Sequence, residues 1–390
     1  MAFHRASQAE VNLSALRDNF TLVRKLLPPT TEILAVVKAD AYGHGVLPCA
    51  KTLLDAGANG LGVAIGNEGI ELRENGIKRP ILVMGGFVPE EIGDLIHHNL
   101  EITLHEKNQA IAIAQEAHRQ NKCVKVHLKI DTGMGRLGTL PSAVADLVNY
   151  INSQKSLQLV GVSTHLATAE WEDKQHSREQ IEKFKAITTP LKKKGTLFPI
   201  LHCANSAGII NHPESWFDCV RPGIMLYGAF PSTRLDAVLA ESGAENPKLK
   251  PVMTWKCRLL QIKDVPKGTP LSYGAIFTTQ RDSRIGLIGV GYADGLHRQL
   301  SNKMELLIRG KRVPQVGRIC MDSTLVDVTD HPEIKVGDEA VIFGRQNDAC
   351  IRVEETAENC GTVSYELLCA VGQRVPRVYI DPARPQRGSK

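Results

Sequence analysis

Eight short apolar runs recur along the first 223 residues, and stretches with the apolar spacing of amphipathic helices separate them. Two of these helical stretches span residues 106–120 and 174–193. The apolar runs are five to nine residues long and span 33–39, 60–65, 80–85, 100–104, 123–130, 157–165, 199–204 and 218–223. A repeated strand–helix order predicts parallel strands joined by crossover helices, which is an α/β fold.

The number and length of these units favour a closed barrel. Eight strand–helix units within about 210 residues suit a (β/α)₈ barrel of the TIM type, whose usual size is about 250 residues. An open, doubly wound sheet is the alternative, because periodicity alone does not show that the sheet closes.

The sequence changes character after Pro231. A polar connection spans 231–251, and beyond it the chain contains mostly short strands separated by turn signals such as Gly268 and Gly310. One helical interruption is expected within 353–372. We therefore predict a barrel over 11–235 and a mostly β C-terminal domain over 236–385. Residues 1–10 are expected to join the second domain, and 386–390 to form a flexible tail.

Composition excludes several classes of function. A formal net charge of +5 is too small and too dispersed to indicate nucleic-acid binding. The nine cysteines include no C-x-x-C pair, which argues against a disulfide framework and favours a reducing compartment. No signal-peptide pattern and no apolar run of about 18 residues is present. We expect a cytoplasmic protein without a membrane segment.

Polar residues gather where five of the predicted strands end. In barrels of this kind the chemistry lies at the carboxyl ends of the strands. The residues found there are Lys38, Tyr42, Lys129, Asp131, Arg136, His165, His202, Asn205, Ser206, Arg221 and Gly223. Barrels often bind phosphate in the loops after strands seven and eight, where Asn205-Ser206 can cap a helix and Gly223 allows close approach of a ligand.

A lysine near a phosphate site suggests pyridoxal 5'-phosphate held at Lys38. A lysine bound to this cofactor anchors it, and the lysine released by substrate can act as a base. Arg221 is placed to face the pyridine nitrogen of the cofactor. Because arginine does not give up its proton, the ring nitrogen would stay unprotonated, which should limit side reactions such as transamination.

Several longer motifs resemble the alanine racemases of the pyridoxal-phosphate barrel type. The resemblance extends through both predicted domains in order. The motifs are AVVKADAYGHG, KIDTGMGRLG, HCANSAG, RPGIMLYG, LSYGAIF, GVGYADG, GRICMDSTLVDV and GTVSYE.

The resemblance implies a two-base racemase that acts on alanine. Lys38 would hold the cofactor and act on one face of the substrate, and Tyr273 of a second subunit would act on the other face. His165 and Arg221 would tune Tyr273 through hydrogen bonds. The protein would be a homodimer that supplies D-alanine for peptidoglycan.

The resemblance also implies roles for further residues. Those expected to hold the cofactor, besides Lys38, His165 and Arg221, are Tyr42, Asn205, Ser206, Gly223, Ile224 and Tyr365. Arg136 and Met321 would bind the substrate carboxylate, and Lys129, often carbamylated in relatives, would orient Arg136. The residues expected to support the site or line its access path are His202, Tyr292, Arg298, Arg318, Cys320 and Asp322. Glu170 departs from the family, which commonly has aspartate there.

Other functions are open on the sequence. A racemase of another small amino acid such as serine, or a related pyridoxal-phosphate decarboxylase, would share much of this pattern, although a decarboxylase needs no second base. A non-catalytic carrier of the cofactor would leave the second domain unexplained. A metal-dependent barrel hydrolase could use His165, His202 and Asp131, but the sequence has no H-x-H ligand pair and this function would leave Lys38 unexplained. We expect no metal.

Overall fold

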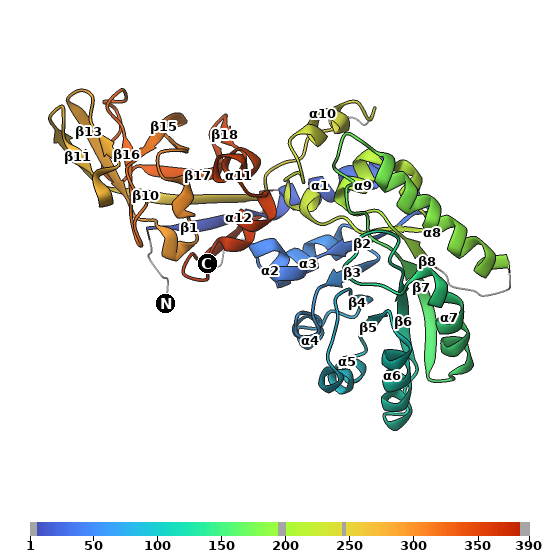
Figure 1. Cartoon of the computed structure of the whole chain (residues 1–390). Coiled ribbons are helices and arrows are strands. Elements are labelled where there is room, and N and C mark those ends of the chain that lie inside the picture. The colour runs from blue at the N-terminus through green and yellow to red at the C-terminus, as the bar shows by residue number, and fades with distance from the viewer. Residues whose placement is uncertain (1–5, 194–199, 244–246, 383–390) are drawn as a thin grey trace.

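A computed structural model of the chain describes residues 6–193, 200–243 and 247–382. The expected flexible tail at 386–390 lies outside the described residues. Figure 1 shows two parts, a barrel drawn in blue to green and a β-rich part drawn mainly in orange and red.

Eight parallel strands close into a barrel, which confirms the predicted fold class and excludes the open sheet. The strands are β2 (Glu32–Val36), β3 (Gly60–Val63), β4 (Ile81–Val83), β5 (Glu101–Leu104), β6 (Val124–Lys129), β7 (Leu157–Ser163), β8 (Ile200–His202) and β9 (Cys219–Val220). β9 pairs with β2 to complete the ring. Each strand falls on one of the eight predicted runs, and β2 alone begins outside its run, one residue early at Glu32.

Helices cover the outside of the barrel because their apolar faces pack on the outward residues of the strands. They are α1 (Leu13–Leu26), α3 (Val46–Asp55), α4 (Gly66–Glu74), α5 (Ile92–His97), α6 (Lys107–Arg119), α7 (Val144–Ser153), α8 (Gln175–Lys193) and α9 (Ser206–Asn211). The short segment α2 (Lys38–Gly43) follows β2 and has a left-handed backbone. The polar connection after Pro231 also contains a helix, α10 (Arg234–Ala240), whose Leu235 and Leu239 are buried.

The second part is built on a nine-stranded sheet with the order β18-β17-β14-β15-β16-β13-β10-β1-β19. Its strands are β1 (Gln8–Asn12), β10 (Met253–Val265), β13 (Ser283–Ile288), β14 (Glu305–Ile308), β15 (Lys311–Val316), β16 (Thr324–Asp327), β17 (Glu339–Gln346), β18 (Ala349–Ile351) and β19 (Arg377–Ile380). β11 (Pro270–Leu271) and β12 (Phe277–Thr278) form a separate two-stranded sheet. Along the chain they lie between β10 and β13.

The region expected to hold one helix holds two. These are α11 (Val353–Cys360) and α12 (Ser364–Ala370). Gly361, with φ of 72°, ends α11 in the left-handed conformation that glycine adopts readily.

The β-rich part and the barrel are joined at both ends of the chain. β1, blue in Figure 1, pairs antiparallel with β10 and parallel with β19 before α1 enters the barrel. Ser364 Oγ in α12 donates to the backbone oxygen of Phe230 at 2.9 Å. These contacts bring α12 next to the barrel mouth.

Within the described residues, no helix combines the length and apolar content needed to cross a membrane.

Candidate active site

A cavity of about 320 Å³ opens at the carboxyl end of the barrel strands. This volume falls in the range of about 300–1,000 Å³ that is usual for small-molecule sites. The cavity brings together twelve of the residues selected from the sequence. They are Lys38, Tyr42, Lys129, Arg136, His165, His202, Asn205, Ser206, Arg221, Gly223, Ile224 and Tyr365. Tyr365 comes from α12, so the β-rich part contributes one wall.

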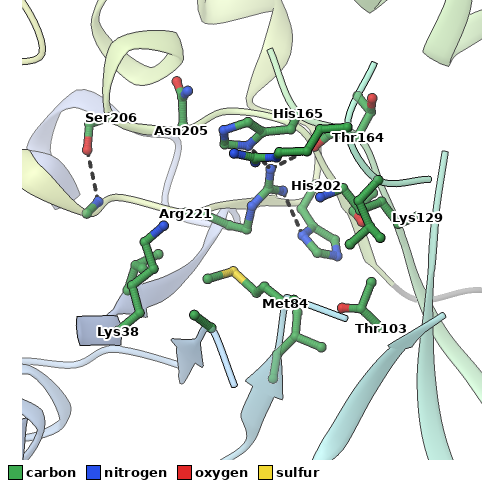
Figure 2. A pocket seen from close by; sticks show the side chains of 18 of the residues that line it. Lys38, Met84, Thr103, Lys129, Thr164, His165, His202, Asn205, Ser206 and Arg221 are labelled. Carbon is green, nitrogen blue, oxygen red and sulfur yellow. Dashed lines mark hydrogen bonds between the residues drawn. The ribbon is translucent and has the colours of Figure 1, made fainter. Parts of the chain in front are cut away.

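Lys38 stands at the end of β2, at the start of a left-handed turn. Four successive residues, Ala39 to Tyr42, have φ between 52° and 54°. A left-handed conformation costs a non-glycine residue about 1–2 kcal/mol, so such a run persists only where its surroundings hold it. The turn aims the Lys38 side chain into the cavity (Figure 2).

Side chains bind the backbone of this turn on several sides. Glu68 Oε1 accepts from the amide of Ala39 at 2.6 Å, while its Oε2 accepts from Ala64 at 2.7 Å. Asp40 Oδ1 accepts from the amide of Val46 at 2.6 Å. His44 is fully buried, and its Nδ1 lies 3.0 Å and 2.9 Å from the carbonyl oxygens of Ala41 and Tyr42. Asp40 and Glu68 therefore fix the conformation that positions Lys38.

Arg221 occupies the centre of the cavity wall (Figure 2). Its Nη1 lies 2.8 Å from Nδ1 of His202. Its Nη2 donates to the backbone oxygens of Thr164 at 2.7 Å and Cys203 at 3.0 Å, and lies 3.4 Å from Nδ1 of His165. Nε of Arg221 has no hydrogen-bond partner among the described residues, so it can donate to a ligand.

The cations of the cavity lower one another's affinity for protons. Burial, and next the charge of Arg136, lower the pKa of Lys38. Burial, with Arg221 and Arg136, lowers the pKa of Lys129 to about 8. Burial and the charge of Arg221 hold the pKa of His165 well below its usual value. Lys38 is therefore more readily neutral than a surface lysine, as a nucleophile and base must be.

The loops after β8 and β9 meet through Ser206. Asn205 caps α9, since its side chain accepts from the amide of Gly208 at 2.9 Å. Ser206 Oγ accepts from the amide of Gly223 at 2.9 Å, as the dashed line in Figure 2 shows. A Cβ at position 223 would lie 2.3 Å from the hydroxyl oxygen of Tyr42. Only glycine allows that hydroxyl to stand beside the loop.

Arg136 is carried by a loop that Asp131 holds. The carboxylate of Asp131 accepts from the amides of Gly133 and Met134 at 2.9 Å, and from Gly135 at 3.0 Å. Asp131 is thus a structural residue of this loop, and it does not line the cavity. No group of three or more potential metal ligands occurs within residues 6–193, 200–243 and 247–382.

The other seven selected residues do not line the cavity of this chain. They gather in the β-rich part, and they are Tyr273, Tyr292, Arg298, Arg318, Cys320, Met321 and Asp322. Ser272 Oγ, next to Tyr273, donates to the backbone oxygen of Arg318 at 2.6 Å. The amide of Tyr292 donates to the backbone oxygen of Cys320 at 3.0 Å. Tyr273 is 71% exposed and Met321 is 53% exposed.

The sequence did not reveal some of the residues at the site. Met84, Thr103, Ser163 and Thr164 line the cavity, although they are ordinary members of apolar or alternating strand ends. Glu68 lies in a polar segment with the pattern of an exposed helix, and none of the motifs quoted above includes it. Its position at the third residue of α4 was the one available signal, since acidic residues favour helix N-termini.

The fold and the cavity define a two-domain barrel enzyme whose chemistry takes place at the carboxyl edge of the barrel. Family models identify it further. The model of the alanine racemase N-terminal domain matches residues 11–231, and that of the alanine racemase C-terminal domain matches residues 252–379. The chain belongs to the alanine racemase family, which confirms the resemblance. Alanine racemases are isomerases that use pyridoxal 5'-phosphate, and the family's known role is to supply D-alanine for peptidoglycan.

Individual relatives match over nearly the full length. The alanine racemase of Halothermothrix orenii is 44% identical over 375 residues, which are 96% of this chain and 97% of the relative. That of Desulforamulus reducens is 44% identical over 374 residues, covering 95% and 98%.

Solved structures also match over nearly the full length of the chain. The alanine racemase of Clostridium difficile 630 has a TM-score of 0.89 at 36% identity and covers 97% of this chain and 96% of that chain. The alanine racemase of Bacillus anthracis with bound L-Ala-P has a TM-score of 0.89 at 34% identity, covering 98% and 97%.

Proposed function

We propose that this chain interconverts L-alanine and D-alanine with pyridoxal 5'-phosphate at Lys38, and that Lys38 and Tyr273 of a second copy are the two bases. The observation that carries the proposal is that the Lys38 side chain and Arg221 line one cavity of suitable size. The lysine provides an amine with a lowered pKa, and Arg221 provides an Nε–H without a partner among the described residues.

The residues of the cavity fit the cofactor. The hydroxyl of Tyr42 has no partner among the described residues and stands beside Gly223, where a phosphate oxygen could accept from it. Ser206, Ile224 and Tyr365 complete that side. Arg221 would donate from Nε to the pyridine nitrogen. When bound, the cofactor withdraws electrons from the substrate's α-carbon and so makes its proton removable.

The chain's own residues would then move and hold protons. Lys38 Nζ would remove or return the α-proton on one face. Arg136 would hold the substrate carboxylate, assisted by Met321 of the second copy. His165 accepts at Nδ1 from Arg221, so its remaining proton lies on Nε2 and can be donated to the Tyr273 oxygen. That bond would favour the deprotonated phenol, which a base must become at neutral pH.

Two sets of exposed apolar side chains support a homodimer. One set follows barrel strands at the cavity mouth: Ile65, Val88, Leu140 and Trp171, which are 50–66% exposed. The other set surrounds Tyr273 on the β-rich part: Ile276, Tyr292 and Met321. In a twofold dimer each set of one copy would cover the other set of its partner, which would bring Tyr273 over the partner's cavity.

Proton exchange tests the proposal. L-alanine is incubated with the protein and the cofactor in deuterated water, and α-deuteration and optical rotation are followed. We expect the wild type to lose rotation and to label both enantiomers. Tyr273→Phe should still exchange the proton of D-alanine but should not invert it, whereas Tyr150→Phe, on α7 and remote from the cavity, should behave as the wild type. Borohydride reduction should leave a pyridoxyl group on Lys38.

The alternatives give different results. Release of carbon dioxide from an amino acid would indicate a decarboxylase. Faster inversion of serine than of alanine would indicate a serine racemase. A wild-type protein that neither binds the cofactor nor exchanges the α-proton would overturn the proposal.

A further inference from the structure

A line of buried side chains crosses the barrel interior from Arg221 to the opposite end of the strands. Arg221 Nη1 lies 2.8 Å from His202 Nδ1. His202 Nε2 lies 2.9 Å from His127 Nδ1. His127 Nε2 lies 3.1 Å from Glu101 Oε2. Neither His127 nor Glu101 lines the cavity or was selected from the sequence.

The barrel leaves room for this line at Gly161. His127 in β6 is paired with Gly161 in β7, and His202 lies on the far side in β8. A Cβ at position 161 would lie 2.4 Å from Nδ1 of His127. The missing side chain is what lets the two imidazole rings meet across β7. Both histidines are at most 3% exposed.

The proton positions along the line follow from its two ends. Arg221 can only donate, so Nδ1 of His202 must accept and its proton lies on Nε2. His127 must then accept at Nδ1, and its own proton on Nε2 is donated to Glu101. A protonated His127 would present a second donor to His202 and break this order. Each histidine is therefore neutral, and every donor points toward Glu101.

The outer end of the line keeps its charge. Glu101 lies at the wall of a second cleft, of about 430 Å³, at the amino end of the strands. Its Oε1 is 3.7 Å from Nζ of Lys125. Burial raises the pKa of Glu101, but its interactions with His127 and, next, with Lys125 give a net lowering. The carboxylate thus remains an acceptor at neutral pH.

We propose that His127 and Glu101 are positioning residues, which fix His202 as an acceptor and thereby hold the Arg221 guanidinium with Nε directed into the cavity. This inference rests on the proposed function, because it assigns the free Nε to the cofactor. Without the line, the proton of His202 could move to Nδ1 and would then face the Nη1 proton of Arg221. Two opposed donors cannot bond, so the guanidinium would turn away.

The test compares variants that remove the line with one that preserves its pattern. His127→Phe removes both ring nitrogens, and Glu101→Met removes the final acceptor. His127→Gln keeps one acceptor and one donor but cannot pass a proton as an imidazole does. Lys78→Gln is the matched control, because it changes an exposed lysine that lines the same cleft as Glu101 but is not part of the line. For each holoenzyme we would measure kcat, KM, cofactor dissociation and thermal unfolding.

We expect His127→Phe and Glu101→Met to lower kcat and cofactor affinity by about 10- to 100-fold, the scale known for outer partners of metal ligands. KM for alanine should change little, because the groups assigned to the carboxylate do not touch the line. His127→Gln should retain most of the activity, and Lys78→Gln should match the wild type. The effects of two substitutions in one hydrogen-bonded line do not add. The double variant of His127→Phe and Glu101→Met should therefore lose no more activity than either single variant.

Histidine-selective ¹⁵N NMR of the cofactor-free protein gives a readout independent of activity. His127 and His202 should both be neutral and protonated at Nε2. In Glu101→Met the two histidines should no longer be protonated at Nε2 alone, and a form protonated at Nδ1 should appear. Wild-type kinetics in His127→Phe, or equal losses in His127→Gln and His127→Phe, would overturn the proposal. A wild type that does not bind the cofactor would instead contradict the proposed function, and the NMR result would still test the line.

Discussion

Arg377 Nε donates a hydrogen bond to the backbone oxygen of Gly43 at 2.9 Å. This contact ties β19, at the end of the described chain, to the left-handed turn that begins after Lys38. The same guanidinium donates to the backbone oxygens of Gly372 and Val375. Lys38, the lysine proposed to be catalytic, is thus positioned partly by a residue that lies 339 positions further along the sequence.

Arg377→Met should weaken this connection. It leaves several carbonyl groups without a donor, and we expect the free energy of unfolding to fall by about 2–4 kcal/mol. Cofactor affinity should fall as well, because the Lys38 turn loses a support. Urea unfolding and cofactor titration would measure the two effects. Arg281→Met is the control, since Arg281 forms a surface ion pair with Asp330. Equal losses in both variants would contradict the assigned role.

Gly223→Ala should impair the proposed phosphate side. The added Cβ would lie 2.3 Å from the hydroxyl oxygen of Tyr42, so the tyrosine or the loop must shift. Overpacking of this kind costs about 1–3 kcal/mol, and we expect about a tenfold or greater loss of cofactor affinity. Equilibrium titration with pyridoxal phosphate would measure it. Gly86→Ala is a matched control, because no heavy atom lies within 4 Å of its added Cβ. Unchanged affinity in Gly223→Ala would show that the cofactor does not use this side.

Much of the site could be predicted because the carboxyl ends of parallel strands meet at one edge. That rule is enough to bring Lys38, His165 and Arg221 together from three distant segments. The left-handed turn could not be predicted, because alanine and tyrosine disfavour positive φ, and the single aspartate among the four residues is a weak signal. Its conformation is held by Asp40 within the turn and by the distant residues Glu68 and Arg377.

Residues inside the barrel were harder to predict for a different reason. His127 lies in a strand in which apolar and polar side chains alternate. This alternation predicts that His127 points into the barrel, but it does not predict which other inward residue His127 contacts. The meeting of His127 and His202 depends on the absence of a side chain at Gly161. The grouping of Tyr273 with Met321 came from the family resemblance and from no rule about strands.

Lys129 should make stability depend on pH in the alkaline range. Burial, with the charges of Arg221 and Arg136, lowers its pKa from the ordinary value of 10.5 to about 8. Between these values the unfolded chain binds the proton that the folded chain has lost. The contribution of Lys129 to the free energy of unfolding therefore rises with pH from about 8 to 10.5, and below pH 8 the full penalty opposes folding.

Comparing Lys129→Met with the wild type isolates this contribution, because the other titrating groups are common to both proteins. The stability of the wild type relative to the variant should increase as pH is raised through that window. Urea unfolding at several pH values would measure it. Lys51→Met, at an exposed position of α3, should show no such trend. A difference between wild type and Lys129→Met that is constant from pH 7 to 10.5 would contradict the prediction.

Mixing two inactive variants should restore activity if the site is shared between copies. In a heterodimer of Lys38→Ala and Tyr273→Phe, one site carries both changes and the other carries neither. Random mixing makes half of the dimers heterodimers, so about a quarter of the wild-type activity should return. The mixture would be prepared by unfolding and refolding the two variants together, and racemisation of alanine would be measured.

Refolding each variant alone controls for residual activity, and co-refolded wild type sets the full scale. A second mixture, of Lys38→Ala with Arg221→Met, should remain inactive. Both of those residues belong to the same cavity of one chain, so in their heterodimer each site still carries one change. No recovery in the first mixture would place Tyr273 in the same chain's site and remove the reason for a shared dimer. Recovery in the second mixture would contradict the placement of Lys38 and Arg221 in one cavity.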